Sequence, residues 1–474
     1  MATSMGTLPS GGGLFIPSAV LLLLLQLTNI AMAIGVNYGT LGDNIPPPAD
    51  VAKFLKNNTV INRVKIYDTN PDIIRAFANT GIALTITAIN GEIPALVQID
   101  FARQWVANHI APFFPQTRII RVLVGNEILH WGGEDLISNL LGAMRTLRQA
   151  LDQAGFRSIQ VSTAHSLGII ENSEPPSRCR FRAMYKRVLS PLLQFHRETR
   201  SPFMVNPYPY FAYDPNSSKG SNFYLFKRPT RGLYDRATGK RYTNMYDLLL
   251  DAVYMAMRAY GYGDVGIAVG ETGWASQGDA GLAPGIKNAI DFNGGLVRHL
   301  RSKTGTPLMP NRSFETYIFA LFNENQKPGP LAEKNFGLFK PDFSPVYHVG
   351  VLRSEQSPRG RAPLRPAPGG RGRGRGRGKA VTVPSAGKQW CIPKPGVSVQ
   401  ALQLNINYIC GQGIDCRPVQ AGGACFQPNN LHAQASYLMN SYYQTKGHFL
   451  YNCDFTRTGM LTSTNPSHGS CIYK

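Results

Sequence analysis

From residue 34 to about residue 350, β-rich runs alternate with amphipathic helical segments. Asn70 and Pro71 mark one helix start, and Gly155 and Gly261 stand where two other helices end. Eight strands that each return through a helix predict an α/β chain folded as a (β/α)8 barrel. A doubly wound open sheet is the alternative, but no Gly-rich nucleotide loop follows the first strand. The expected strands cover residues 35–39, 63–68, 83–89, 121–127, 159–165, 203–209, 267–273 and 317–324.

Two short motifs place a single glutamate at the end of an expected strand. Glu127 closes RVLVGNE and Glu271 lies in IAVGETGW. In a barrel both strand ends face the same mouth, where the active sites of this fold lie. Two converging carboxyls are what cleavage of a glycosidic bond needs, one as the acid for the leaving oxygen and one as the carboxylate for the anomeric carbon. The pair therefore indicates a hydrolase of sugar polymers.

The N-terminus has the features of a secretory signal peptide over residues 1–33. An apolar stretch at 14–27 is followed by Ala31-Met32-Ala33, an A-x-A cleavage pattern, although no basic residue precedes the stretch. A membrane anchor is the alternative, but the run is short for a membrane span. We expect a secreted, extracellular protein without a transmembrane or lipid anchor.

Six of the seven cysteines fall between residues 391 and 471. This density predicts a small disulfide-stapled domain over residues 389–474, folded in an oxidising compartment, with fifteen possible pairings. A zinc site is the weaker interpretation because no CxxC spacing occurs. Cys179 is expected to be an unpaired thiol. Trp390, Tyr442 and Tyr443 are candidates either to stack on sugar rings or to fill the small core.

The net charge of +21 is concentrated between the two expected domains. Residues 353–388 hold ten Lys and Arg against one acid, Glu355, and include RGRGRGRGK at 371–379. A composition this rich in Pro, Gly and Arg predicts a disordered linker over residues 351–388. An RG repeat can indicate RNA binding, but no RNA-binding fold accompanies it, so we expect no nucleic acid partner. Acidic wall polysaccharide is the expected partner of this linker.

Longer stretches resemble a known family. IGVNYGTLGDNIPPP, RVKIYDTNPDIIRAFANTGI, VNPYPYFAYDP and ETYIFALFNENQKPGP, together with VGNE and GETGW, resemble the plant glucan endo-1,3-β-glucosidases of glycoside hydrolase family 17 over residues 34–350. WCIPKPGVSVQALQLNINYICGQGIDC, GGACFQP and NCDF resemble the X8 module, or carbohydrate-binding module family 43, which binds β-1,3-glucan.

The resemblance implies a monomeric endo-hydrolase of 1,3-β-D-glucosidic linkages in β-1,3-glucans such as callose and fungal wall glucan, acting without cofactor or metal. It implies a retaining mechanism with Glu127 as acid/base and Glu271 as nucleophile. Glu315 is expected to be structural. The residues implied to bind substrate are Tyr38, Asn126, Asn206, Tyr208, Trp274 and Glu324, with Tyr208 also donating to Glu271.

The resemblance also implies a cysteine pairing and leaves one question about activity. It joins Cys391 to Cys453, Cys410 to Cys416 and Cys425 to Cys471. The family usually has proline after GETGW, whereas this chain has Ala275. Loss of a ring that fixes φ can loosen the loop behind the nucleophile. A non-hydrolytic or transglycosylating β-1,3-glucan-binding wall protein is therefore the alternative function.

Overall fold

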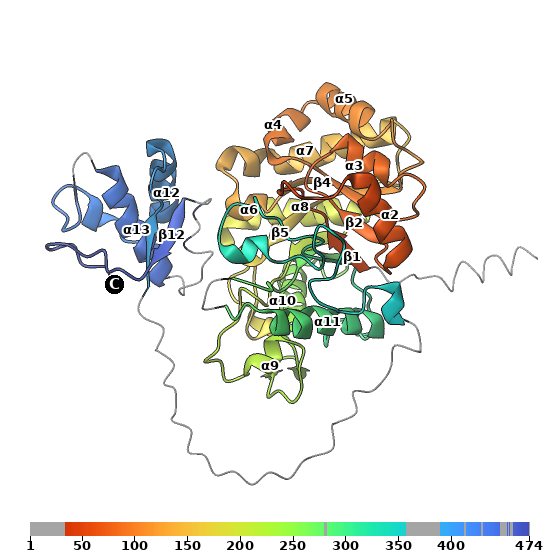
Figure 1. The fold of residues 1–474 in the computed structure, drawn as a ribbon. Coiled ribbons are helices and arrows are strands. Elements are labelled where there is room, and N and C mark those ends of the chain that lie inside the picture. Colours follow the sequence, from red (N-terminus) through yellow and green to blue (C-terminus); the bar gives the residue numbers. More distant parts are fainter. Residues whose placement is uncertain are drawn as a thin grey trace, which may run out of the picture.

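Eight parallel strands close into a barrel, as the sequence predicts. The computed structural model describes residues 34–278, 282–356, 389–411, 414–427, 430–445 and 458–473, together with Cys453 and Phe455. Figure 1 shows the barrel strands enclosed by helices, with the C-terminal module beside them. The barrel strands are β1 Ile34–Asn37, β2 Arg63–Lys65, β3 Ala83–Ala88, β4 Ile119–Asn126, β5 Gln160–Ser166, β6 Phe203–Asn206, β9 Ile267–Thr272 and β10 Thr316–Ile318.

Helices return the chain between consecutive strands. Asn70 caps α3, because its side chain accepts from the backbone N–H groups of Asp72 and Ile73. Asn244 caps α10 in the same way through Asp247 N. The helices of the barrel are α2 Pro48–Asn58, α3 Pro71–Ala76, α4 Ile93–Leu96, α5 Ile99–His109, α6 Ile128–Trp131, α7 Glu134–Gln153, α8 Lys186–Thr199, α9 Ser221–Tyr224, α10 Met245–Ala259 and α11 Ile286–Ser302.

The strands run in chain order around the barrel, and β10 closes it by pairing with β1 through Ile34 and Thr316. Some strands are shorter than expected: β6 ends at Asn206, directly before Pro207, which lacks the N–H that a sheet ladder requires. A small hairpin, β7 Leu233–Asp235 and β8 Lys240–Tyr242, is inserted before α10.

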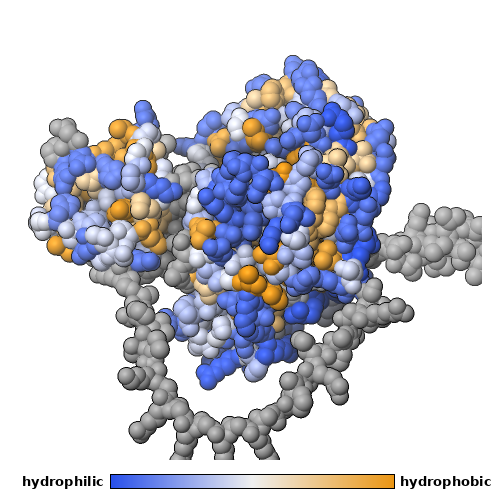
Figure 2. Space-filling view, in the orientation of Figure 1, coloured by the Kyte–Doolittle hydropathy of each residue, from blue (hydrophilic) through white to orange (hydrophobic). Residues whose placement is uncertain are grey.

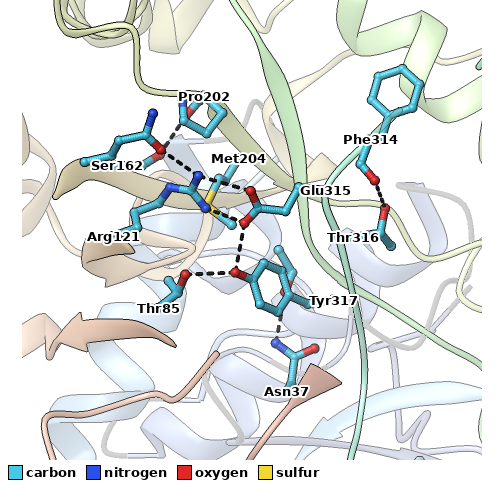
Figure 3. A network of polar contacts seen from close by, with 12 residues as sticks. Asn37, Thr85, Arg121, Ser162, Pro202, Met204, Phe314, Glu315, Thr316 and Tyr317 are labelled. Carbon is cyan, nitrogen blue, oxygen red and sulfur yellow. Dashed lines mark hydrogen bonds and ion pairs between the residues drawn. The ribbon is translucent and has the colours of Figure 1, made fainter. Parts of the chain in front are cut away.

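The barrel interior is polar at the end opposite the carboxyl ends of the strands. Figure 3 shows Arg121 of β4 facing Glu315, with the Tyr317 hydroxyl between Glu315 and Thr85. Arg121 is 3% exposed. The expectation that Glu315 is structural agrees with this placement, since it forms an ion pair at the base of the barrel, away from the mouth.

The structured part of the barrel domain continues beyond the expected boundary at residue 350. Val351 is buried and its carbonyl accepts from Val60 N at 2.8 Å. Leu352 pairs with Thr59, and the short helix η6, Arg353–Gln356, follows. The expected linker over 351–388 is therefore wrong at its start. Its remaining part, 357–388, and the expected signal peptide, 1–33, lie outside the described residues.

The C-terminal module contains a two-stranded antiparallel sheet, β11 Trp390–Pro393 and β12 Gly459–Thr462, and two helices, α12 Val399–Gly411 and α13 Leu431–Thr445. Helix α13 packs against both β11 and α12. The core of the module includes Trp390, Tyr442 and Tyr443, which are at most 9% exposed. These three aromatics therefore fill the core. The disulfides are Cys391–Cys453, Cys410–Cys416 and Cys425–Cys471, the pairs that the resemblance implies.

Disulfides suit so small a module, because each bridge contributes about 2–4 kcal/mol of stability by restricting the unfolded chain.

Cys179 of the barrel is unpaired and buried. In the face shown in Figure 2, hydrophilic residues cover most of the barrel, with apolar residues in smaller patches. Within the described part of the chain, no helix combines the length and apolar character that crossing a membrane requires.

Candidate active site

A cleft of about 1240 Å³ opens at the carboxyl ends of the barrel strands. Pockets for small ligands usually measure about 300–1,000 Å³, so this volume suits a polymer. Glu127 and Glu271 both line the cleft. Of the residues predicted to bind substrate, those that also line it are Tyr38, Asn126, Asn206, Tyr208 and Glu324.

Glu127 lies one residue beyond the end of β4, in the left-handed conformation with φ 55° and ψ 33°. This conformation costs energy for a residue other than glycine and is found most often at functional sites. It is held by the bond from Glu127 N to Ala164 O at 2.8 Å. Gly125, at φ 68°, supports the same turn, because a Cβ there would lie 2.7 Å from Ile128. The bend directs the Glu127 carboxyl into the cleft.

Two donors hold the Glu127 carboxyl. Asn206 Nδ2 donates to Oε1 at 2.8 Å, and Trp131 Nε1 donates to Oε2 at 2.8 Å. Burial, reinforced by the negative charge of Glu271, raises the pKa of Glu127 to about 7, although both donors and Lys65 act in the opposite direction. Below neutral pH, Glu127 is therefore protonated and able to act as an acid.

Glu271 lies in β9 and is 7% exposed. Lys65 Nζ, on β2, lies 2.8 Å from Oε1, and the Tyr208 hydroxyl donates to Oε2 at 2.9 Å. Burial by itself would raise the pKa of Glu271. The charge and hydrogen bond of Lys65, the charge of Lys327 and the hydrogen bond of Tyr208 outweigh burial and lower that pKa. Glu271 is therefore kept ionised, as a nucleophile must be.

The end of β6 connects the two carboxyls. Asn206 binds Glu127, and Tyr208, two residues further along the chain, binds Glu271. Gly270 permits this approach, since a Cβ there would lie 2.7 Å from Asn206 Oδ1. One strand end thus positions an acid and a carboxylate together, in environments that shift their pKa values in opposite directions.

Two amide oxygens of the mouth have hydrogen-bonding capacity that the described protein atoms do not use. Asn126 Oδ1 and Asn206 Oδ1 are buried without a partner among the described residues. Both residues line the cleft. Buried polar atoms are costly unless they are hydrogen-bonded, so these atoms are suited to receive hydroxyl groups of a bound sugar.

A further cluster of charges stands on the loop after β10. Glu324 Oε1 accepts from Leu41 N at 2.9 Å, which ties this loop to the one after β1. Lys327 Nζ lies 3.9 Å from Glu324 Oε2 and 3.3 Å from Glu333 Oε2. Glu324 thus connects the loops after β10 and β1 beside the cleft, with Lys327 at ion-pair distance from its carboxylate.

Trp274 corrects one prediction. Its side chain is fully buried, its indole N–H donates to Ala283 O at 3.0 Å, and it packs against Tyr210 and Phe292. It does not line the cleft. A position just after a strand places a residue near the mouth, but the loop conformation turned this ring into the core. Ala275 beside it is also buried, and its carbonyl accepts from Gly285 N.

Residue patterns missed two groups that touch the glutamates, Lys65 and Trp131. Lys65 is fully buried within the strand segment RVKIYD. A lysine is rarely buried without a charged partner, so its place in a β-rich run could have indicated a buried ion pair. Trp131 follows Glu127 by four residues, a spacing that brings side chains together on one helical turn. His130, weighed and set aside from sequence, bonds Ser166 Oγ, and burial lowers its pKa to about 4.

Comparisons with known proteins identify the family of the barrel and of the C-terminal module. The model of "Glycosyl hydrolases family 17" matches residues 34–351, and the "X8 domain" model matches residues 389–460. A Triticum aestivum protein named glucan endo-1,3-beta-glucosidase is 51% identical over 450 residues, covering 94% of this chain and 95% of that one. An Olea europaea protein named glucan endo-1,3-beta-D-glucosidase is 44% identical, covering 93% of each.

Solved structures give the same result for the barrel. A beta-1,3-glucanase and allergen of Cryptomeria japonica pollen is 41% identical, with a TM-score of 0.63, and covers 67% of this chain and 98% of that one. A structure from a study of two plant beta-glucan endohydrolases is 34% identical, with a TM-score of 0.61, and covers 66% and 99%. The chain belongs to glycosyl hydrolases family 17, is a glycoside hydrolase, and carries an X8 domain after its barrel.

Proposed function

We propose that the protein is a secreted endo-hydrolase that cleaves 1,3-β-D-glucosidic linkages in β-1,3-glucans, with callose or fungal wall glucan as substrate, and retains the anomeric configuration. The observation that carries this proposal is the pair of buried glutamates with opposed pKa shifts in one cleft. The relatives named for the same activity, 51% and 44% identical along nearly the whole chain, support the linkage.

In the first step, Glu271 attacks the anomeric carbon as a carboxylate while Glu127 gives its proton to the leaving glycosidic oxygen. The bond to the leaving sugar breaks and an ester bond to Glu271 forms. Lys65 and Tyr208 hold the Glu271 oxygens in position for this attack. A protonated Glu127 is available because its pKa is raised to about 7.

In the second step, Glu127, now ionised, takes a proton from water as the water attacks the same carbon. The ester bond breaks, Glu271 returns as a carboxylate, and the configuration has been inverted twice. Asn206 and Trp131 support this step because they donate to the ionised form of Glu127. Asn126 is positioned to contact the sugar through its unpaired Oδ1, and we assign that contact to the 2-hydroxyl.

The stereochemistry of the first product tests the proposal. Direct attack requires carboxyl groups about 5–5.5 Å apart and yields the β-anomer, whereas a separation of about 6.5–9.5 Å admits a water and yields the α-anomer. We expect proton NMR of a fresh laminarin digest to show the β-anomer before mutarotation. An α-anomer appearing first would contradict the roles assigned to both glutamates.

The second candidate is a glucan-binding wall protein that mainly transfers sugar instead of hydrolysing. Ala275 in place of the usual proline motivates it, since the loop behind Glu271 loses one φ restraint. Reducing ends released from laminarin, compared with longer transfer products in the same digest, separate the two. Transfer products that exceed new reducing ends would favour the second candidate, and Ala275→Pro would then restore hydrolysis.

The remaining features indicate where the enzyme acts. We assign residues 1–33 to an export signal and the protein to the apoplast or cell wall, which agrees with the stapled module. The basic segment before the module is assigned to acidic wall polysaccharide through its charge. Extraction from isolated cell walls tests both, because a chain held by charge should be released by salt.

A further inference from the structure

The cleft extends beyond the barrel. Its lining continues from Glu127 along the loop after β5 and includes Tyr408 of α12 and Tyr442 of α13, both in the C-terminal module. Figure 1 shows the module on the side of the barrel where α6 and β5 lie. Chain segments more than two hundred residues apart in sequence thus contribute to one surface.

Direct contacts form the barrel part of this wall. The Trp131 indole donates to Glu127, and the His130 ring stacks on the Trp131 ring with 4.0 Å between the ring centroids. His130 Nδ1 in turn lies 2.6 Å from Ser166 Oγ. Gly168 packs on the His130 ring, and its carbonyl accepts from Arg182 Nε at 2.7 Å. A continuous wall therefore leads from the acid/base to Arg182.

Met184, two residues after Arg182 in the chain, adds an exposed apolar side chain to the lining of the same cleft. Its side chain is 55% exposed and lines the cleft. A large exposed apolar side chain within a cleft indicates a ligand-binding surface, whereas a single one on an open surface is common and indicates nothing. Its neighbour Tyr185 also lines the cleft and is buried.

The module supplies one exposed aromatic to the same cleft. Tyr408 is 38% exposed, whereas the other aromatic that the module contributes, Tyr442, is 9% exposed. The two hydroxyls lie 3.1 Å apart, and the rings of Tyr408 and Phe455 pack edge-on at 6.5 Å. Tyr408 is therefore held in place by its neighbours with part of its ring facing the cleft.

We propose that Tyr408 of the module and Met184 of the barrel form a composite outer subsite for the same β-1,3-glucan chain that the glutamates cleave. The proposal rests on the proposed function for the identity of the chain. Tyrosine and methionine offer uncharged apolar surfaces, which suit the C–H face of a neutral sugar ring. The module then lengthens the catalytic cleft, in addition to any tethering to insoluble glucan.

The test compares long and short soluble β-1,3-oligosaccharides with the full chain. Tyr408→Ala and Met184→Ala should each lower the ratio of kcat/KM on long to short substrates by about three- to tenfold, the effect of one aromatic or apolar contact. The change should appear mainly in KM, because only chains long enough to reach the outer subsite lose the contact. Tyr408→Phe keeps the aromatic ring, so its ratio of kcat/KM on long to short substrates should equal that of the unmodified enzyme.

Phe426→Ala is the matched control, since Phe426 is 36% exposed on the same module but does not line the cleft. It should leave the ratio unchanged. A loss in Tyr408→Ala with none in Met184→Ala would show that the module binds glucan by itself and would overturn the composite subsite. An equal loss in Phe426→Ala would overturn it as well.

Binding to the full chain carrying Glu271→Gln separates this proposal from the proposed function. Calorimetry with long oligosaccharides should show weaker binding when Tyr408→Ala or Met184→Ala is added, and the two effects should be non-additive because both residues contact one ligand segment. Such binding with no hydrolysis by the unmodified enzyme would refute the function while supporting the subsite. Hydrolysis with binding that ignores both residues would refute the subsite alone.

Discussion

The barrel interior contains a carboxylate–cation pair at each end, and the two pairs have different geometries. At the mouth, Lys65 contacts one oxygen of Glu271. At the base, Arg121 binds both oxygens of Glu315, at 2.7 and 3.3 Å, and Tyr317 donates a further bond at 2.8 Å (Figure 3). A guanidinium fixes a carboxylate through its planar fork, whereas an ammonium acts as a point charge.

This difference separates a structural site from a reactive one. At the base, Arg121 also donates to Gln160 and the Tyr317 hydroxyl pairs with Thr85, so both donors of Glu315 are themselves held by protein groups, although Arg121 Nε has no partner among the described residues. Around the mouth, Asn126 and Asn206 each keep a buried amide oxygen unpaired among the described residues, and both residues line the cleft. A charge pair thus stabilises the fold where the protein supplies its partners, and serves chemistry where some of those partners are left to the substrate.

Removal of the nucleophile should give the largest effect. We expect Glu271→Ala to lower kcat on laminarin by roughly 10³-fold or more, because no ester intermediate can form. The matched control at the other end is Glu315→Gln, which should lower the melting temperature while retaining far more activity. Near-normal turnover in Glu271→Ala, with loss in Glu315→Gln instead, would reverse the comparison.

Replacing the cation at the mouth should give the next largest effect. Lys65→Met removes the charge that keeps Glu271 ionised, so kcat should fall by about 10²-fold, the usual cost of losing one preorganised charged donor. The pKa of Glu271 should rise, because the lowering effect of Lys65 is gone. Activity requires ionised Glu271, so the acid limb of the pH–rate profile should move to higher pH.

Lys65→Arg is the control, because it keeps the positive charge and should leave the acid limb closer to that of the unmodified enzyme than Lys65→Met does. An unmoved acid limb in Lys65→Met would show that Lys65 does not set the ionisation of Glu271.

The sequence predicted the barrel and its two glutamates because both depend on local pattern. Strand and helix periodicity identifies the elements, and closure of eight parallel strands then places residues at strand ends around one mouth. Glu127 and Glu271 needed no knowledge of side-chain direction. The same argument failed for Trp274, whose loop turns the ring into the core between Tyr210 and Phe292.

Contacts across the barrel were beyond that reasoning. Lys65 and Glu271 are 206 residues apart in sequence, and their strands, β2 and β9, are not neighbours in the barrel. The contribution of Tyr408 to the cleft depends on how the module lies against the barrel, and the periodicity of a sequence does not encode that placement. Trp390 was a candidate for sugar contact by residue type, but a small domain uses its large aromatics to fill its core.

Breaking the pair at the base should affect stability more than catalysis. Arg121→Met leaves the Glu315 carboxylate, whose side chain is 17% exposed, without its main partner, which costs up to about 3–5 kcal/mol of unfolding free energy. Denaturant unfolding measures this loss, and kcat, taken where the variant is folded, should change far less than in Lys65→Met. Adding Glu315→Leu removes the unpaired carboxylate and should recover part of the lost unfolding free energy. A double variant less stable than Arg121→Met would contradict this account.

The smallest effect concerns the hydrogen bond from Trp131 to Glu127. That bond favours the ionised carboxylate, so Trp131→Phe should raise the pKa of Glu127 above its value of about 7. Because the first step needs protonated Glu127, activity is present below this pKa and is lost as the pH rises through it. The basic limb should therefore move upward, by up to about one pH unit for a charge-assisted hydrogen bond.

Trp105→Phe is the matched control for this shift. Trp105 lies in α5, is 2% exposed and does not line the cleft. The same chemical change there can lower stability but has no path to Glu127, so the basic limb should stay in place. A limb that moves downward in Trp131→Phe, or equally in both variants, would mean that Trp131 does not stabilise the ionised acid/base. The mouth would then control its acid through burial and the charge of Glu271 alone.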